Sequence, residues 1–269
     1  MPGMRRQADG GTQGRLVRER DVRVRVQEVQ RPAKTHAAGE DLDMRRTWYA
    51  AEGSKLAEFW TILHLPYTAM SLSFLAIGFG IAGVQRWDVF AWIVIAYFLG
   101  LGTAAHAFDQ LPGQGSSYVK YLTPWELMIL GMAAVIAAMM IGIYWMYELA
   151  AWQLGWIIIL QTSFVITYPI SKSFKGFFHT DFWFAVSFGF IPVMAGYYIN
   201  TLTLNPEFVP WAIVAALISG IEITLSRYVR KWRHNVYLLQ EPCVIDKPET
   251  ALKLLCLLSY VLAIIFILR

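Results

Sequence analysis

Several residues with side chains capable of acid–base chemistry lie at or near the ends of long apolar stretches of this sequence. His106 and Asp109 lie three residues apart, a spacing that puts both on one face of a helix. A carboxylate beside an imidazole can orient the ring as a general base or as a metal ligand. The pair therefore predicts a catalytic site, or in a simpler interpretation an interfacial pair whose members satisfy each other.

A second group of this kind spans residues 179–181. His179 and Asp181 flank Thr180 and could supply a further base and acid. The same segment fits a helix start, because Thr180 or Asp181 can accept the free N–H groups of a first turn. The two interpretations are compatible. The predicted catalytic residues are His106, Asp109, His179 and Asp181.

Basic residues follow the apolar run that ends near residue 226. Arg227, Arg230 and Arg233 recur every three residues and form one helical stripe. Such a stripe is typical of the cytoplasmic side of a membrane protein, where it contacts lipid head groups. It also fits an anion site, because the arginine fork binds phosphate oxygens bidentately, and Lys172 and Lys175 could extend that site.

The predicted substrate-binding residues lie at the same depth as these groups. His64 precedes Pro66, which frees the carbonyl four residues earlier and predicts a kink in the first apolar helix. His64 itself fits either helix packing or ligand binding. The full predicted set is His64, Tyr67, Tyr168, Lys172, Lys175, Arg227 and Arg230.

Seven apolar stretches, each near the roughly 20 residues that a membrane helix needs, position these groups. Of the 269 residues 57% are apolar and 16% are charged, against about 25% charged in soluble domains. The sequence thus predicts an all-α polytopic membrane protein with about seven transmembrane helices, and it excludes a compact nucleic-acid-binding domain and a disulfide scaffold. The stretches are 57–84, 89–108, 125–147, 153–170, 182–199, 208–226 and 251–268.

The segment before the first stretch differs sharply in composition. Residues 1–56 hold 12 of the 23 Lys and Arg and 8 of the 19 Asp and Glu, so the whole net charge of +4 lies there. The segment lacks the apolar run of a secretory signal and has too few large apolar residues to offset the entropy of folding. We predict a disordered basic and polar tail over 1–56, with an interfacial helix over 42–56, followed by a membrane domain over 57–269.

The distribution of Lys and Arg predicts the orientation. One side of the membrane would carry Lys55, Lys120 and the basic cluster from Arg227 onward, and the other only Arg86 and Arg269. The positive-inside rule places the N-terminus in the cytoplasm of a multi-pass cell-membrane protein. The polar groups above then line a cavity that opens to the cytoplasm.

Several absent motifs narrow the function. The chain has no Walker-type or GxGxxG loop, no GxSxG elbow and no HExxH helix. It has no lysine at mid-depth in the seventh stretch to hold retinal and few charges at mid-bilayer, which argues against an ion transporter.

One run of residues resembles the UbiA superfamily of intramembrane prenyltransferases. Tyr168-Pro169-Ile170-Ser171-Lys172 is similar to the segment that ends the fourth helix of that family, and Phe188-Gly189-Phe190-Ile191-Pro192 falls in the helix that follows. Residues 102–109 lie where the family ends its second helix with an Asp-rich motif. The resemblance covers roughly residues 57–235 and implies a UbiA-like bundle that binds an isoprenoid or isoprenoid diphosphate and transfers a prenyl group.

The chain departs from that family at both Asp-rich motifs. Asp109 is the one acidic residue left in the first, and arginines replace the second near residues 224–240. The resemblance implies Mg²⁺, for which Asp109 is the candidate ligand, while arginines could stabilise a diphosphate without metal. The alternatives are a non-catalytic membrane scaffold or accessory subunit and, third, a small-solute transporter. The expected partners are membrane lipids and a lipid-soluble substrate, with no nucleic acid.

Overall fold

The computed structural model describes residues 48–51, 53–83, 86–112, 119–170, 176–239 and 243–269, with the backbone alone at 170, 233–239 and 243–245. Every regular element within these residues is helical. The predictions for the tail before residue 48 and for Lys172 and Lys175 fall outside the described residues. Residues 48–51, 53 and 54 hold a turn and a helix cap, and the first helix begins at Lys55.

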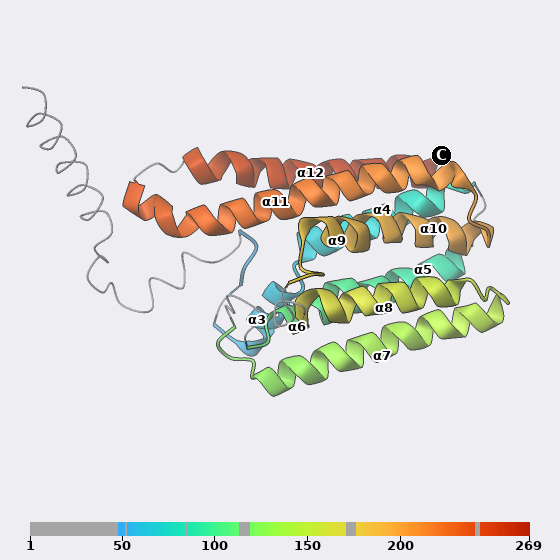
Figure 1. The fold of residues 1–269 in the computed structure, drawn as a ribbon, viewed down its shortest axis with the longest axis horizontal. Helices are drawn as coiled ribbons and strands as arrows, with labels where there is room; N and C mark the ends of the chain where they lie inside the picture. Colours follow the sequence, from blue (N-terminus) through green and yellow to red (C-terminus); the bar gives the residue numbers. More distant parts are fainter. Residues whose placement is uncertain (1–47, 52, 84–85, 113–118, 171–175, 240–242) are drawn as a thin grey trace, which may run out of the picture. The chain divides into compact units, whose positions relative to one another are not determined.

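Successive helices cross the bundle in alternating directions (Figure 1). Four of the crossings are made of consecutive helical segments, and the other three are single helices. In chain order they are α3 (Lys55–Ile62) with α4 (Leu65–Ile81); α5 (Trp87–Tyr97), η1 (Phe98–Ala105) and α6 (His106–Asp109); α7 (Pro124–Glu148); α8 (Leu154–Ile170); α9 (Asp181–Ala185), η3 (Val186–Phe190) and α10 (Ile191–Thr201); η4 (Pro206–Phe208) with α11 (Val209–Leu239); and α12 (Cys243–Leu268).

Six helical runs among the described residues are long and apolar enough to cross a membrane, which supports a multi-pass membrane protein. The fourth predicted span corresponds to Leu154–Pro169, which is apolar but shorter than the other six. Because α8 lies antiparallel beside α7 in Figure 1, it still crosses much of the bundle. The seven-span count remains a prediction.

The first crossing breaks at His64. Pro66 has no N–H, so the carbonyl of Ile62 cannot receive its helical hydrogen bond. The chain leaves the helix there: His64 adopts the left-handed conformation, with φ of 46°, and its Nδ1 lies 2.8 Å from the Ile62 oxygen. The predicted kink is therefore a break between α3 and α4, and the freed carbonyl is paired with an imidazole.

Two segments, η1 and η3, are wound as π-helices. A π-helical turn contains one extra residue and shifts the faces of the helix that follows it, and such turns are frequent at functional sites. Small residues permit the change: a β-carbon at Gly102 in η1 would lie 2.5 Å from Thr68 Cγ2. The two π-segments set the directions of His106 and of Phe188, which face the cavity described below.

The core forms where α4 meets α10 and α12. A β-carbon at Gly78 would lie 2.0 Å from the Val193 oxygen, and one at Gly196 would lie 1.9 Å from the Leu75 oxygen. The backbones of α4 and α10 are thus in direct contact, as is typical where small residues line membrane-helix interfaces. This contact fixes the position of α4, which carries Tyr67 to the cavity.

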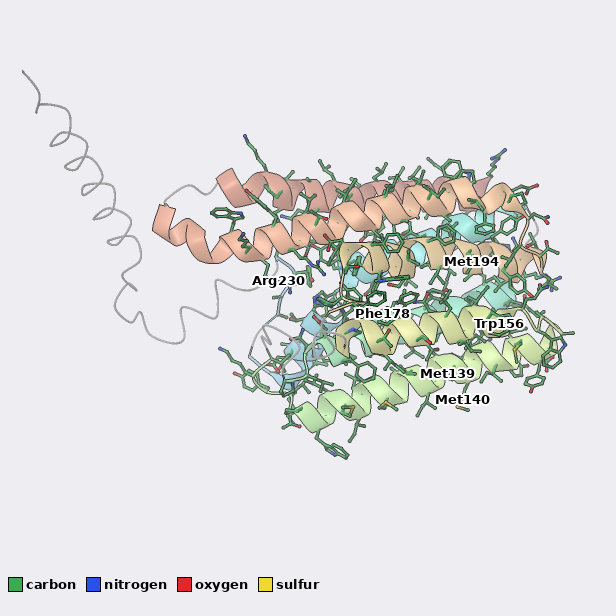
Figure 2. All side chains as sticks on the ribbon, in the orientation of Figure 1. Met139, Met140, Trp156, Phe178, Met194 and Arg230 are labelled. Atoms are coloured by element: carbon green, nitrogen blue, oxygen red, sulfur yellow. The ribbon has the colours of Figure 1, made fainter. Side chains whose placement is uncertain are left out.

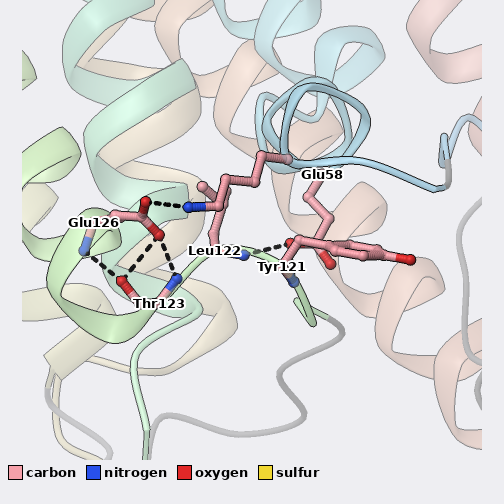
Figure 3. A network of polar contacts seen from close by, with 6 residues as sticks. Glu58, Tyr121, Leu122, Thr123 and Glu126 are labelled. Atoms are coloured by element: carbon pink, nitrogen blue, oxygen red, sulfur yellow. Dashed lines mark hydrogen bonds and ion pairs between the residues drawn. The ribbon is translucent and has the colours of Figure 1, made fainter.

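Glu58 ties α3 to the loop before α7. Its carboxylate is 7% exposed and accepts the backbone N–H groups of Lys120, Tyr121 and Leu122, the last two at 2.8 Å (Figure 3). The neighbouring Glu126 forms a capping box with Thr123. Glu58 therefore supplies the acceptor for three successive amides of a loop whose residues are exposed or half-buried.

We expect Glu58→Ala to destabilise the bundle by about 1–3 kcal/mol, since hydrogen bonds to a charged group contribute roughly 1.5–3 kcal/mol while the freed amides of this loop can bind water. The matched control is Lys55→Met, which removes only the exposed ion pair between Lys55 and Glu126, an interaction that contributes about 0–1 kcal/mol. Thermal unfolding in detergent compares the two variants. Equal melting temperatures would show that the loop amides do not depend on Glu58.

Candidate functional site

A polar cavity lies among α4, α6, the end of α8, α9 with η3, and α11. It is at the end of the bundle beyond which α11 extends, where Arg230 is labelled in Figure 2. Segments far apart in the sequence therefore meet at one depth. The residues that line the cavity are His64, Tyr67, Ser71, Ala105, His106, Asp109, Tyr168, Pro169, His179, Phe184, Phe188, Glu222, Ile223, Ser226, Arg227 and Arg230.

Most of the predicted site residues are brought together here. The cavity is lined by His64, Tyr67, His106, Asp109, Tyr168, His179, Arg227 and Arg230. Asp181 does not line the cavity but contacts Arg227 from outside it. Lys172 and Lys175 lie outside the described residues. The structure thus brings eight of the predicted residues together in one cavity, whereas their catalytic and binding roles stay predictions.

Glu222 lines the cavity but is missing from the set of site residues predicted from the sequence. It is 2% exposed, lines the cavity, and its Oε2 has no hydrogen-bond partner in the described part of the chain. A buried carboxylate oxygen without a donor is costly unless a ligand or water supplies one. Its spacing from Ser226 and Arg230, four residues at each step, places all three on one helical face, and that signal was present in the sequence.

Two imidazoles in the cavity are oriented by backbone carbonyls. His64 Nδ1 lies 2.8 Å from the Ile62 oxygen, and His179 Nδ1 lies 3.1 Å from the Tyr168 oxygen. A carbonyl can only accept, so in each ring Nδ1 carries the proton. When such a ring is neutral, its Nε2 atom is an acceptor, which is the form that a general base or a metal ligand requires.

His64 and His106 form a stacked pair. Their ring centroids are 4.3 Å apart with the planes inclined by 12°. Tyr49 meets His64 edge-on from the segment before α3, with the centroids 5.5 Å apart. Two imidazoles in this arrangement disfavour a charge on both at once, so the pair fits one proton acceptor and one neutral neighbour.

Arg227 connects three helices at the rim of the cavity. One guanidinium nitrogen contacts Asp181 at the start of α9, and the other donates to the Tyr168 hydroxyl at 3.2 Å. Thr180 caps α9, as predicted, by accepting the Trp183 N–H. The arginine head is thus held at the cavity by contacts on both sides, with its own side chain 36% exposed.

The cavity is small. Its volume is about 80 Å³, well below the roughly 300–1,000 Å³ of sites that enclose a drug-sized ligand. It fits a polar head group with two arginines nearby and does not fit a long hydrocarbon chain.

The described residues do not offer a metal site of their own. No group of three or more His, Cys, Asp or Glu among them is arranged around one point. Asp109 and Glu222 are the carboxylates that line the cavity, and Mg²⁺ is commonly held by one or two carboxylates together with substrate phosphates. Metal binding through Asp109 therefore remains a prediction, and no step below is derived from it.

Two substitutions at His64 test what stabilises the break between α3 and α4. His64→Ala loses the donor to Ile62 and keeps a β-carbon at a φ of 46°. His64→Gly loses the same donor but removes the steric penalty of the left-handed region, about 1 kcal/mol. We expect both variants to melt below the wild type and the glycine variant to melt above the alanine variant. An alanine variant as stable as the wild type would contradict this.

In the comparisons with known proteins, no family model, no curated protein and no solved structure matches the chain. The resemblance to the UbiA superfamily therefore rests on the residues of this chain alone. Function has to be argued from the chemistry of the cavity.

Proposed function

We propose that the protein is a UbiA-like membrane protein that binds an isoprenoid diphosphate, with the diphosphate in the polar cavity, and transfers its prenyl group. The observation that carries the proposal is the meeting of Arg227, Arg230 and three imidazoles in one cavity between apolar helices. Ionisable groups inside a membrane bundle are unfavourable and usually mark a functional site.

The two arginines support an anionic ligand. Arginine binds phosphate oxygens through a planar fork and keeps its charge in any environment. Arg230 is exposed at the mouth of the cavity, and Arg227 is held deeper by Tyr168. A diphosphate between them would receive charge-assisted hydrogen bonds, and the unpaired Oε2 of Glu222 would face it through water or as a protonated acid.

The imidazoles support transfer. In the proposed reaction the bond between the first prenyl carbon and the diphosphate oxygen breaks, and the acceptor attacks that carbon. The diphosphate leaves with its charge balanced by Arg227 and Arg230. The proton of the acceptor passes to the Nε2 atom of an oriented imidazole, for which His64 and His179 are prepared.

The proposed orientation follows the Lys and Arg distribution, with the N-terminus and the mouth of the cavity on the cytoplasmic side of the cell membrane. Seven crossings would put the C-terminus on the opposite side. We expect reporter domains fused at the two termini to give opposite accessibility in intact cells. The same accessibility at both ends would mean that α8 does not complete a crossing.

Binding of a C20 isoprenoid diphosphate to protein in nanodiscs tests the proposal. We expect Arg230→Ala to weaken binding by about 10–100-fold, because hydrogen bonds to charged groups contribute roughly 1.5–3 kcal/mol. Arg230→Lys should recover only part of the affinity, since lysine lacks the fork. Lys231→Ala is the matched control: Lys231 is the next residue on α11 but does not line the cavity.

Two results would contradict the proposal. One is a wild-type protein that does not bind the diphosphate; the other is an equal loss of affinity in Arg230→Ala and Lys231→Ala, which would indicate bulk electrostatics. Either would favour the non-catalytic scaffold. For transfer, we expect His64→Asn at saturating isoprenoid diphosphate to release pyrophosphate at least tenfold more slowly in native membranes, because removal of a general base typically costs about 10²–10⁴ in rate.

A further inference from the structure

A second pocket lies among α5, η1, α7, α8 and α10, and it shares no lining residue with the polar cavity. Met139, which lines it from α7, is labelled in Figure 2. The pocket is next to the point where α5 passes into the π-helical η1, and such turns are frequent at functional sites. Small residues leave the space between the helices, namely Ala96, Gly100, Ala138, Gly142 and Ala195.

Two polar side chains that line this pocket lack partners. Tyr97 is 8% exposed, and its hydroxyl has no hydrogen-bond partner in the described part of the chain. Gln161 on α8 is half-buried as a residue, but both polar atoms of its amide are buried, and neither has a partner among the described residues. A buried amide and a buried hydroxyl in this state are costly unless a bound molecule pairs with them.

The surroundings of the pocket suit an uncharged ligand. The segments α5 with η1, α7 and α10 belong to candidate membrane spans, and α8 is an apolar helix of the same bundle. Among the described residues, none that lines the pocket is Asp, Glu, Lys, Arg or His. An ion or a charged head group would therefore lose its hydration here without gaining an opposite charge.

The size of the pocket limits the ligand further. Its volume is about 70 Å³, roughly half of the 150 Å³ cavity that encloses benzene in another protein. A head group of a few heavy atoms fits this space. The Gln161 amide offers a donor at Nε2 beside an acceptor at Oε1, and a primary amide or a protonated carboxyl group matches this pattern with two hydrogen bonds. The Tyr97 hydroxyl supplies a further polar group in the same pocket.

We propose that this pocket binds the head of an uncharged, lipid-soluble molecule that carries a carbonyl and a hydrogen-bond donor on one carbon, as a primary amide or a protonated carboxylic acid does. The carbonyl accepts from Gln161 Nε2, and the donor pairs with Gln161 Oε1. The observation that carries the proposal is the occurrence of an unpaired amide and an unpaired hydroxyl in one pocket without charges. The proposal does not rest on the proposed function, because the polar cavity takes no part in it.

Binding of tritiated octanamide to full-length protein in nanodiscs, measured by scintillation proximity, tests this proposal. We expect saturable binding of about one molecule per chain. Gln161→Leu removes the amide at similar volume and should weaken binding at least tenfold, and Tyr97→Phe should weaken it at least threefold. Gln153→Leu is the matched control, because Gln153 is exposed just before α8 and does not line the pocket. Its affinity should stay within twofold of the wild type.

Gly100→Ala tests the space without a change of polar groups. A β-carbon there would lie 3.9 Å from Val165 Cγ2 and 4.0 Å from the Ala138 β-carbon, which are ordinary contacts between residues that line the pocket. The added methyl group should therefore fit the fold, occupy part of the pocket and weaken octanamide binding at least tenfold. Without ligand, Gln161→Leu should melt above the wild type, because leucine leaves no buried polar atom unpaired.

Competition by unlabelled molecules identifies the head group. Displacement by octanoic acid below its own pKa, and not above it, would assign an acid head; displacement by octanamide alone would assign an amide head; and both would support the shared chemistry. N,N-dimethyloctanamide has no donor and should compete at least tenfold more weakly than octanamide.

Two results would overturn the proposal. One is the absence of saturable binding of both octanamide and octanoic acid to the wild type, which would mean that water alone fills the pocket. The other is wild-type affinity for octanamide in both Gln161→Leu and Gly100→Ala. Binding of an isoprenoid diphosphate should be equal in the wild type and Gly100→Ala, so the proposed function and this proposal can fail separately.

Discussion

The ion pair between Arg227 and Asp181 is the contact on which the polar end of the bundle depends. A charged side chain between membrane helices is unfavourable unless it has partners or reaches water. Arg227 on α11 contacts Asp181 at the start of α9 and the Tyr168 hydroxyl at the end of α8. Three helices are therefore held at one point by one guanidinium. The same group lines the cavity, so in the proposed function the ligand would compete with Asp181 for Arg227.

Carbonyl groups at helix ends orient two of the imidazoles in the cavity. Where a helix stops, its last carbonyls lose their helical partners and need other donors. The Ile62 carbonyl, freed by Pro66, is paired with His64, and the Tyr168 carbonyl near the end of α8 is paired with His179. The backbone requirement for hydrogen bonds in an apolar environment thus fixes the tautomers of two imidazoles. The chemistry that we propose uses the opposite nitrogen of each ring.

Hydropathy and helical spacing predict much of this arrangement, because they determine which segments are apolar and at what depth the polar groups lie. Depth alone places His64, His106 and Arg227 in one layer, whereas their meeting in one cavity depends on how the helices pack. The π-helical turns of η1 and η3 could not be predicted, since they depend on close packing such as Gly102 against Thr68.

Mass spectrometry of the protein purified in mild detergent tests the central claim, that this cavity holds the diphosphate of an isoprenoid lipid. We predict one co-purifying isoprenoid diphosphate at close to one per chain in the wild type. We also predict its loss from Arg230→Ala but not from Lys231→Ala. A wild-type protein that carries only bulk phospholipid, with no species lost from Arg230→Ala, would contradict the account.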